Sequence, residues 1–276
     1  MQYNNPLPLL KAFRLRPQKD LGQNFLVDEN ILSRMVECAE LAPTAQVLEI
    51  GAGLGSLTYF LAQAARQVTA VEIDPDLLAI ARHTTANCEN VDLVQGDILQ
   101  IDMSSLHLTD GFIVVANIPY YITSAIIRKM LNNPEKPARM VLTIQEEVAQ
   151  RICAKAGEMS LLALSVQVFG DARIVLKIPA EAFYPSPKVD SVTLRVDLFQ
   201  QPAIAEEKLD TFFRLTKAGF SQKRKMLRNT LSAGLHLPRE QVDALLTQAA
   251  IDPQRRAQTL SMQEWGTLTD QYLALS

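Results

Sequence analysis

Several features are scarce in this sequence, and each scarcity excludes a class of protein. Only three cysteines occur, far apart and without C-x-x-C spacing, which excludes a disulfide framework and a cysteine-based zinc site. No apolar run reaches the ~18 residues of a membrane-spanning helix, and Pro6 and Pro8 interrupt the apolar patch that a secretory signal would need. The formal net charge is only −3, so the protein as a whole is not a polycation. We therefore expect a cytoplasmic protein that uses neither a metal nor a membrane.

The residues that are present predict a substantial core, because 48% are hydrophobic and 21% are charged. Short apolar runs alternate with segments of helical periodicity from about residue 28 to 155. The runs predict strands at 46–50, 67–73, 91–95, 112–116 and 140–144. Helices are predicted at 56–66 and at 74–84, where Asp74 is the N-cap and Pro75 takes the first helical position. This alternation predicts an α/β fold with a doubly wound, mostly parallel sheet.

The pattern changes in the last third of the chain. Two further strands within 173–196 are expected to close the sheet with an antiparallel pair. After a plausible linker at 199–208, only amphipathic helical stretches follow, near 207–219, 221–233, 238–249 and 261–273. We therefore expect one domain at 1–200, with a basic N-terminal extension, and a small all-helical domain at 201–276.

A glycine-rich turn and two acids follow successive predicted strands. Gly51, Gly53 and Gly55 have G-x-G-x-G spacing, which disfavours a pyrophosphate site and favours a nucleoside that carries an amino-acid tail. Glu72 ends the second strand, where a carboxylate can accept from both ribose hydroxyls of an adenosine. Asp97 follows the third strand, where it can accept from the adenine N6 amine. Since the carboxyl ends of parallel strands meet, these residues resemble the S-adenosylmethionine pocket of class I methyltransferases, which are Rossmann-like.

The stretch N-I-P-Y at 117–120 follows the fourth strand, beside the same crevice. An adenine amine is a poor nucleophile because its lone pair is delocalised into the ring. The Asn117 side-chain oxygen and the Ile118 carbonyl can accept hydrogen bonds from the two N–H groups of this amine. Such hydrogen bonds favour a pyramidal nitrogen. Pro119 restricts Ile118 to extended geometry. Tyr120 offers a flat face on which a flipped base can stack. The sequence therefore predicts a site that methylates an exocyclic amine.

Motifs along nearly the whole chain resemble one family, the small-subunit ribosomal RNA adenine N6-dimethyltransferases. The matching stretches are LGQNFL (21–26), EIGAGLGSLT (49–58), VEID (71–74), GDIL (96–99), NIPYYITS (117–124), FYPSPKVDSVTLRV (183–196) and FSQKRKMLRNTL (220–231). The resemblance implies dimethylation of two adjacent adenosines in the 3′-terminal hairpin loop of small-subunit rRNA, late in 30S assembly. It implies S-adenosylmethionine as cofactor, the rRNA and the pre-30S particle as partners, and a monomer.

The family pattern also adds residues to the site. Asn24 and Leu26 would line the cofactor pocket together with Gly51, Gly53, Glu72, Asp97 and Asn117. Phe183 would form a second aromatic wall across the base from Tyr120. One departure is Ile118, where leucine is commoner; because this position contributes a carbonyl, little effect is expected.

Basic residues cluster in two places. Ser221 is expected to be an N-cap, which would place Lys223, Arg224 and Lys225 in the first turn of a helix, with Arg228 near its packed edge. Side-chain charge and the helix N-terminus would together bind RNA phosphates. The second cluster, in the N-terminal extension, consists of Lys11, Arg14, Arg16 and Lys19.

Three alternatives remain open at this point. The first is a macrolide-resistance type enzyme, with the same chemistry on large-subunit rRNA, although the C-terminal block fits it poorly. The second is a ribosome-assembly or transcription factor that binds RNA without catalysis. The third, a hydride-transfer enzyme, is disfavoured by the glycine spacing.

Overall fold

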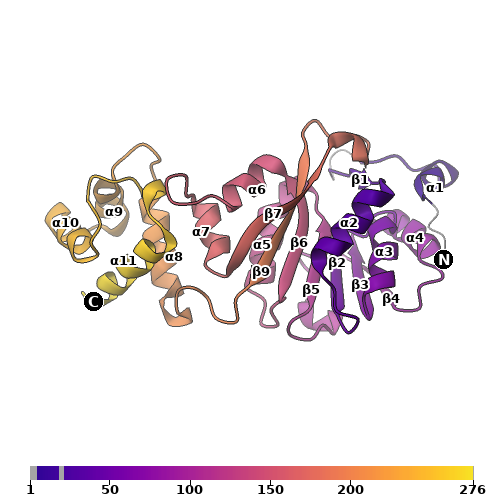
Figure 1. Cartoon of the computed structure of the whole chain (residues 1–276), viewed down its shortest axis with the longest axis horizontal. Coiled ribbons are helices and arrows are strands. Elements are labelled where there is room, and N and C mark those ends of the chain that lie inside the picture. The colour runs from indigo at the N-terminus through magenta and orange to yellow at the C-terminus, as the bar shows by residue number, and fades with distance from the viewer. Residues whose placement is uncertain (1–4, 19–21, 276) are drawn as a thin grey trace. The chain divides into compact units, whose positions relative to one another are not determined.

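The computed structural model describes residues 5–18 and 22–275, and the chain divides into two compact units (Figure 1). The first comprises Met1–Ala149 and Arg173–Leu198, and the second comprises Gln150–Ala172 and Phe199–Ser276. The boundary expected near residue 200 therefore has a counterpart at 198/199. Residues 150–172, which the sequence placed in the first domain, group instead with the C-terminal helices. They do so because α7 (Leu161–Gln167) packs against α8 (Leu209–Gly219).

Within the described residues, seven strands of the chain form one sheet in the order β4-β3-β2-β5-β6-β9-β7. The strands are β2 (Gln46–Ile50), β3 (Gln67–Glu72), β4 (Val91–Gln95), β5 (Ile113–Asn117), β6 (Arg139–Gln145), β7 (Gly170–Ile178) and β9 (Ser191–Leu198). The pairs β2/β3, β3/β4, β2/β5 and β5/β6 are parallel, whereas β9 runs antiparallel to β6. The predicted doubly wound, mostly parallel sheet is confirmed, including its antiparallel closure.

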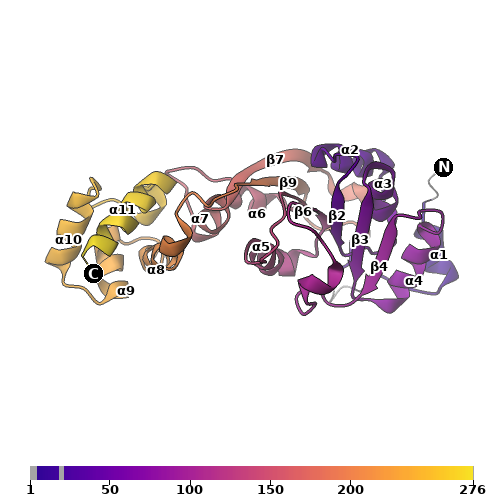
Figure 2. The ribbon, with the colours of Figure 1, turned by 90° about the horizontal axis from the view of Figure 1, so that it is seen from below.

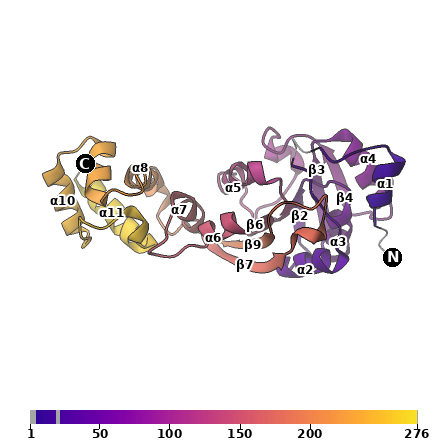
Figure 3. The same cartoon turned by 90° about the horizontal axis from the view of Figure 1, so that it is seen from above.

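Helices cover both faces of this sheet. The first unit contains α1 (Leu7–Ala12), α2 (Glu29–Ala39), α3 (Ser56–Ala64), α4 (Pro75–Thr84), α5 (Thr123–Leu131) and the start of α6 (Glu146–Ile152). Figures 2 and 3 show α2 and α5 on opposite faces. Helix α4 begins as predicted, because the Asp74 carboxylate accepts from the amide of Asp76 at 3.0 Å and Pro75 follows.

The order of the strands creates a crevice beside β2. From β2 the chain proceeds outward through β3 and β4, then returns to build β5 on the other side of β2. Ligands of open α/β sheets bind at such a switch point, outside the carboxyl ends of the strands. Gly55 allows α3 to pack closely on α4 there, since a Cβ at this position would lie 2.9 Å from the Cα of Ala81.

The second unit is helical in its C-terminal part. It contains α8, α9 (Leu227–Leu235), α10 (Arg239–Gln248) and α11 (Met262–Ala274). Trp265 of α11 is fully buried, and Gly219 leaves room for it, because a Cβ at Gly219 would lie 2.5 Å from the indole. Ser261 and Glu264 form a capping box at the start of α11. In the described part of the chain, no helix combines the length and apolarity needed to cross a membrane.

Candidate active site

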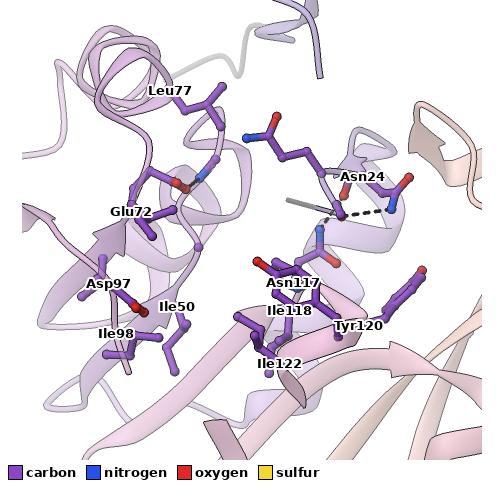
Figure 4. Close-up of a pocket in the computed structure, with 18 of the residues that line it drawn as sticks. Asn24, Ile50, Glu72, Leu77, Asp97, Ile98, Asn117, Ile118, Tyr120 and Ile122 are labelled. Atoms are coloured by element: carbon purple, nitrogen blue, oxygen red, sulfur yellow. Dashed lines mark hydrogen bonds between the residues drawn. The ribbon is translucent and has the colours of Figure 1, made fainter. Parts of the chain in front are cut away.

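A cavity of about 280 Å³ opens at the carboxyl ends of the parallel strands. Its walls come from residues of the segments 22–25, 50–53, 71–73, 96–99 and 117–122, together with Leu77. Figure 4 shows the acids Glu72 and Asp97 on one side of the cavity and Asn117 and Tyr120 on the other. The cavity therefore offers carboxylate acceptors on one wall and the N-I-P-Y segment on the other.

Glu72 is fixed by backbone donors at both of its oxygens. The amide of Gly53 donates to Oε2 at 2.7 Å, and the amide of Asp74 donates to Oε1 at 2.9 Å. Burial raises the pKa of the Glu72 carboxyl, and these two hydrogen bonds oppose the rise. Gly53 adopts the left-handed conformation, with φ +56°, which brings its amide to the carboxylate. Each oxygen keeps further acceptor capacity, so Glu72 is suited to a ligand with two adjacent hydroxyls.

Asp97 lies in a tight turn after β4. Its Oδ1 accepts from the amide of Leu99 at 2.9 Å, so within the turn Oδ2 is left to accept from a ligand. Lys129 of α5 holds the same turn from outside, because its Nζ donates to the carbonyl oxygens of Leu99 at 3.3 Å and Ile101 at 2.6 Å. The helix that follows the N-I-P-Y segment thus anchors the loop that carries Asp97.

The amide of Asn117 has a defined orientation. Its Nδ2 donates to the backbone carbonyl of Asn24 at 2.9 Å, and the side chain of Asn24 donates to the carbonyl of Gly22 at 3.1 Å. A backbone carbonyl can only accept, so the NH₂ end of Asn117 must face Asn24 and Oδ1 is its remaining acceptor. Ile118 as a whole is only 2% exposed, and it lines the cavity beside Asn117.

Tyr120 begins a short 3-10 turn, Tyr120–Ile122, directly after Pro119. Its hydroxyl lies 2.7 Å from the Oγ of Ser191, the first residue of β9. Burial raises the pKa of the Tyr120 phenol, so it stays neutral near pH 7. Tyr120 lines the cavity, and the face of its ring can stack on a planar ligand.

Two predicted residues are not brought to the cavity. Leu26 and Phe183 are both 4% exposed and pack in the core, where they oppose each other in the short ladder between β1 (Phe25–Leu26) and β8 (Phe183–Tyr184). Successive side chains of a strand point to opposite faces, and it is Phe25 that lines the cavity. Neither residue lines the cavity, and the roles of Phe183 as a second wall opposite Tyr120 and of Leu26 in the cofactor pocket stay predictions.

Other lining residues went unrecognised in the sequence. Ile73 and Ile98 each follow an acid of the site and line the cavity, and Ile73 is 51% exposed. Tyr121, 65% exposed, also lines it. Exposed apolar side chains at a cavity indicate a ligand with apolar surface. The repeated acid-isoleucine pairs at 72–73 and 97–98 were the available signal.

The basic cluster of the second unit is placed differently from the prediction. Helix α9 begins at Leu227, so the exposed residues 223–225 lie in the turn before it and not in its first turn. Ser221 is not its N-cap, because its hydroxyl donates to the carbonyl of Ala218 at the end of α8, at 2.7 Å. Arg228 lies in the first turn and forms an ion pair with Asp243 at 3.4 Å. The turn 223–225 is therefore the accessible part of this cluster.

The N-terminal cluster is partly described. Lys11, Arg14 and Arg16 are exposed, whereas Lys19 lies outside the described residues. Across residues 5–18 and 22–275, no group of three or more His, Cys, Asp or Glu side chains is arranged to hold a metal ion.

Comparisons with known proteins agree with this geometry. The profile of the family described as "Ribosomal RNA adenine dimethylase" matches residues 14–273. A protein named "Ribosomal RNA small subunit methyltransferase A" from Alkaliphilus metalliredigens (strain QYMF) is 39% identical over 274 residues, covering 96% of this chain and 95% of that protein. One of the same name from Dehalococcoides mccartyi (strain CBDB1) is 40% identical over 265 residues, covering 96% of this chain and 91% of that protein.

Solved structures share the fold. The 23S rRNA methyltransferase ErmE superposes with a TM-score of 0.75 at 30% identity, covering 90% of this chain and 99% of that one. A dimethyladenosine transferase from Plasmodium falciparum superposes with a TM-score of 0.79 at 24% identity, covering 90% and 96%. The predicted class I S-adenosylmethionine-dependent methyltransferase fold is confirmed. Because the family profile extends over both compact units, the chain belongs to the ribosomal RNA adenine dimethylase family.

Proposed function

We propose that this protein transfers methyl groups from S-adenosylmethionine to the N6 amines of adenosines in small-subunit rRNA. The observation that carries the proposal is the orientation of the Asn117 amide, which lies across the cavity from Glu72 and Asp97. Its NH₂ group donates to the Asn24 carbonyl, and this leaves Oδ1 as the acceptor. In its finer form, the substrate is a pair of adjacent adenosines in the 3′-terminal hairpin loop. Both are dimethylated late in 30S assembly, in the cytoplasm, by a monomeric enzyme.

The acidic wall fits the cofactor. The fixed carboxylate of Glu72 matches the two ribose hydroxyls, and Oδ2 of Asp97 can accept from the adenine N6 amine. Ile73 and Ile98 offer apolar surface to the adenine ring. The turn at Gly51 and Gly53 leaves space for the amino-acid tail. When bound, the cofactor supplies a sulfonium methyl, an electrophile that needs no metal.

The opposite wall fits the target base. Asn117 Oδ1 and the Ile118 carbonyl would accept hydrogen bonds from the two N–H groups of the amine. This arrangement favours a pyramidal nitrogen whose lone pair can point at the methyl group. Pro119 has no N–H to compete for these acceptors. Tyr120 would stack on the flipped base, an interaction of roughly 1–3 kcal/mol.

The helical domain is assigned to rRNA binding. The exposed turn 223–225 would contact backbone phosphates, with Arg228 contributing behind it. Such contacts position the RNA, and the cavity selects the adenosine after flipping. The proposed partners are small-subunit rRNA and the pre-30S particle.

Methyl transfer from labelled S-adenosylmethionine to 30S particles that lack the modification tests the proposal. We expect label in N6,N6-dimethyladenosine of the small-subunit rRNA. Asn117→Ala should lower turnover by roughly 10²-fold, by analogy with the loss of an oxyanion donor. Asn132→Ala, at an exposed asparagine at the end of α5, is the matched control and should be fully active.

Two other outcomes would replace the proposal. The likeness to the 23S rRNA methyltransferase ErmE favours large-subunit rRNA as a second candidate substrate. Label in 23S rRNA of unmodified 50S particles, and none in 30S particles, would establish it. Cofactor binding without transfer to either particle would indicate an RNA-binding assembly factor.

A further inference from the structure

The hydroxyl of Tyr120 has a buried partner that the proposed function does not use. Ser191 is 1% exposed, and its Oγ lies 2.7 Å from the phenol oxygen. The two residues are far apart in the sequence, and β9 carries Ser191 to the tyrosine only because it pairs with β6 in the register Gln145↔Ser191. The hydrogen bond is therefore a product of the antiparallel closure of the sheet.

The surroundings of Ser191 make it a rigid anchor. Its neighbour Asp190 is held twice, because its carbonyl accepts from the amide of Glu146 at 3.3 Å and its Oδ1 accepts from the amide of Ala180 at 3.2 Å. The strand then continues through residues 191–196, all of which are buried. Ser191 thus starts a fixed strand, whereas Tyr120 sits in a 3-10 turn of three residues.

We propose that Ser191 is a positioning residue that holds the Tyr120 ring in place for stacking on the target base. A tyrosine ring rotates about two side-chain torsions, and χ2 of such a ring is broad. The phenol oxygen lies on the axis about which χ2 turns, so a hydrogen bond to it restrains χ1 and the direction of the ring axis, and thereby holds the ring in one place. Ser191 touches neither the base nor the cofactor in this scheme. The inference rests on the proposed function, because the position of the ring matters only if a base stacks on it.

A double-mutant cycle on methyl transfer to unmodified 30S particles tests the inference. Ser191→Ala and Tyr120→Phe each remove one end of the same hydrogen bond. Each should lower kcat by about 3- to 10-fold, as expected for one neutral hydrogen bond, and leave the KM for S-adenosylmethionine unchanged. The double variant should match either single variant within about twofold. Tyr120→Ala, which removes the ring, should be far more damaging than any of them.

Thr193→Val is the matched control. Thr193 lies two residues along β9, on the same face as Ser191, and is fully buried. Its Oγ1 has no hydrogen-bond partner in the described part of the structure, so removing this hydroxyl should leave kcat unchanged.

The possible results separate the two proposals. Multiplied losses in the double variant, an unaffected Ser191→Ala, or an equal loss in Thr193→Val would each overturn the positioning role while leaving the enzyme's activity established. A wild-type protein that binds the cofactor but transfers no methyl group to 30S particles would overturn the proposed function, and the role of Ser191 with it.

Discussion

Glu49 should make the stability of the protein depend on pH in an unusual direction. This residue lies in β2, is 1% exposed, and points into the interior just before the glycine turn. Burial raises the pKa of its carboxyl to about 8, and the charge of Glu72 adds to the rise. The folded protein therefore keeps Glu49 protonated at pH 7, whereas the unfolded chain ionises it near the ordinary value of 4.5.

The sign and size of this pH dependence follow from the different proton binding of the folded and unfolded states. Between the two pKa values the folded state binds more protons than the unfolded state, so the free energy of unfolding falls as pH rises. The contribution of Glu49 is fully present below 4.5 and is lost as pH rises through about 8. At about 1.4 kcal/mol per pKa unit, the whole loss is on the order of 5 kcal/mol.

Glu49→Gln keeps the shape of the side chain and removes its titration. Urea unfolding between pH 5 and 8.5, followed by circular dichroism, should show wild-type stability falling relative to the variant across this range. Fluorescence of Trp265, the single tryptophan, reports on the second unit and serves as a reference. Glu89→Gln, at an exposed glutamate, is the control and should follow the wild type. Parallel curves for wild type and Glu49→Gln would refute the reasoning.

Three further predictions concern ligands. Glu72→Ala should weaken S-adenosylmethionine binding by roughly 2–4 kcal/mol in calorimetry, because two charge-assisted hydrogen bonds are removed; unchanged affinity would reduce Glu72 to a strand-end acid. Lys129→Met should loosen the Asp97 turn and raise the cofactor Kd by about 3- to 10-fold, and an equal effect of Arg128→Met, at the exposed neighbour, would contradict this. Replacing 223–225 by alanine should reduce the slope of log RNA affinity against log salt by roughly 0.7–0.9 for each phosphate that the variant no longer binds, with cofactor affinity unchanged. If the slope measured by filter binding is unaltered, the N-terminal basic cluster becomes the candidate RNA-binding surface instead.

The parts of the structure that depend on local or topological rules could be predicted from the sequence. Asp74 and Pro75 mark the start of α4 because a cap is a property of adjacent residues. Glu72, Asp97 and Asn117 could be placed around one cavity because parallel strands end at a common edge. Neither inference needed side-chain packing.

The parts of the structure that depend on pairing between distant segments could not be predicted from the sequence. Phe25, rather than Leu26, faces the cavity because the two-residue strand β1 is oriented by β8, more than 150 residues away. Ser221 has the composition of an N-cap, yet its hydroxyl serves the end of the preceding helix, and α9 starts only at Leu227. The partner of Tyr120 became visible only when the β6–β9 register placed Ser191 beside it.

The Glu72 carboxylate is held at both oxygens by the amides of Gly53 and Asp74, so in the proposed binding mode it is preorganised for a diol. Groups that are already ordered lose little conformational entropy when a ligand arrives. They also adapt poorly: a nucleoside that lacks one of the two hydroxyls leaves a buried acceptor unmatched, and such a mismatch is penalised more heavily than the removal of a methylene group from an apolar pocket. If Glu72 binds the ribose as proposed, the rigidity of this one side chain makes the ribose, as well as the reactive sulfonium, a criterion by which the enzyme chooses its methyl donor.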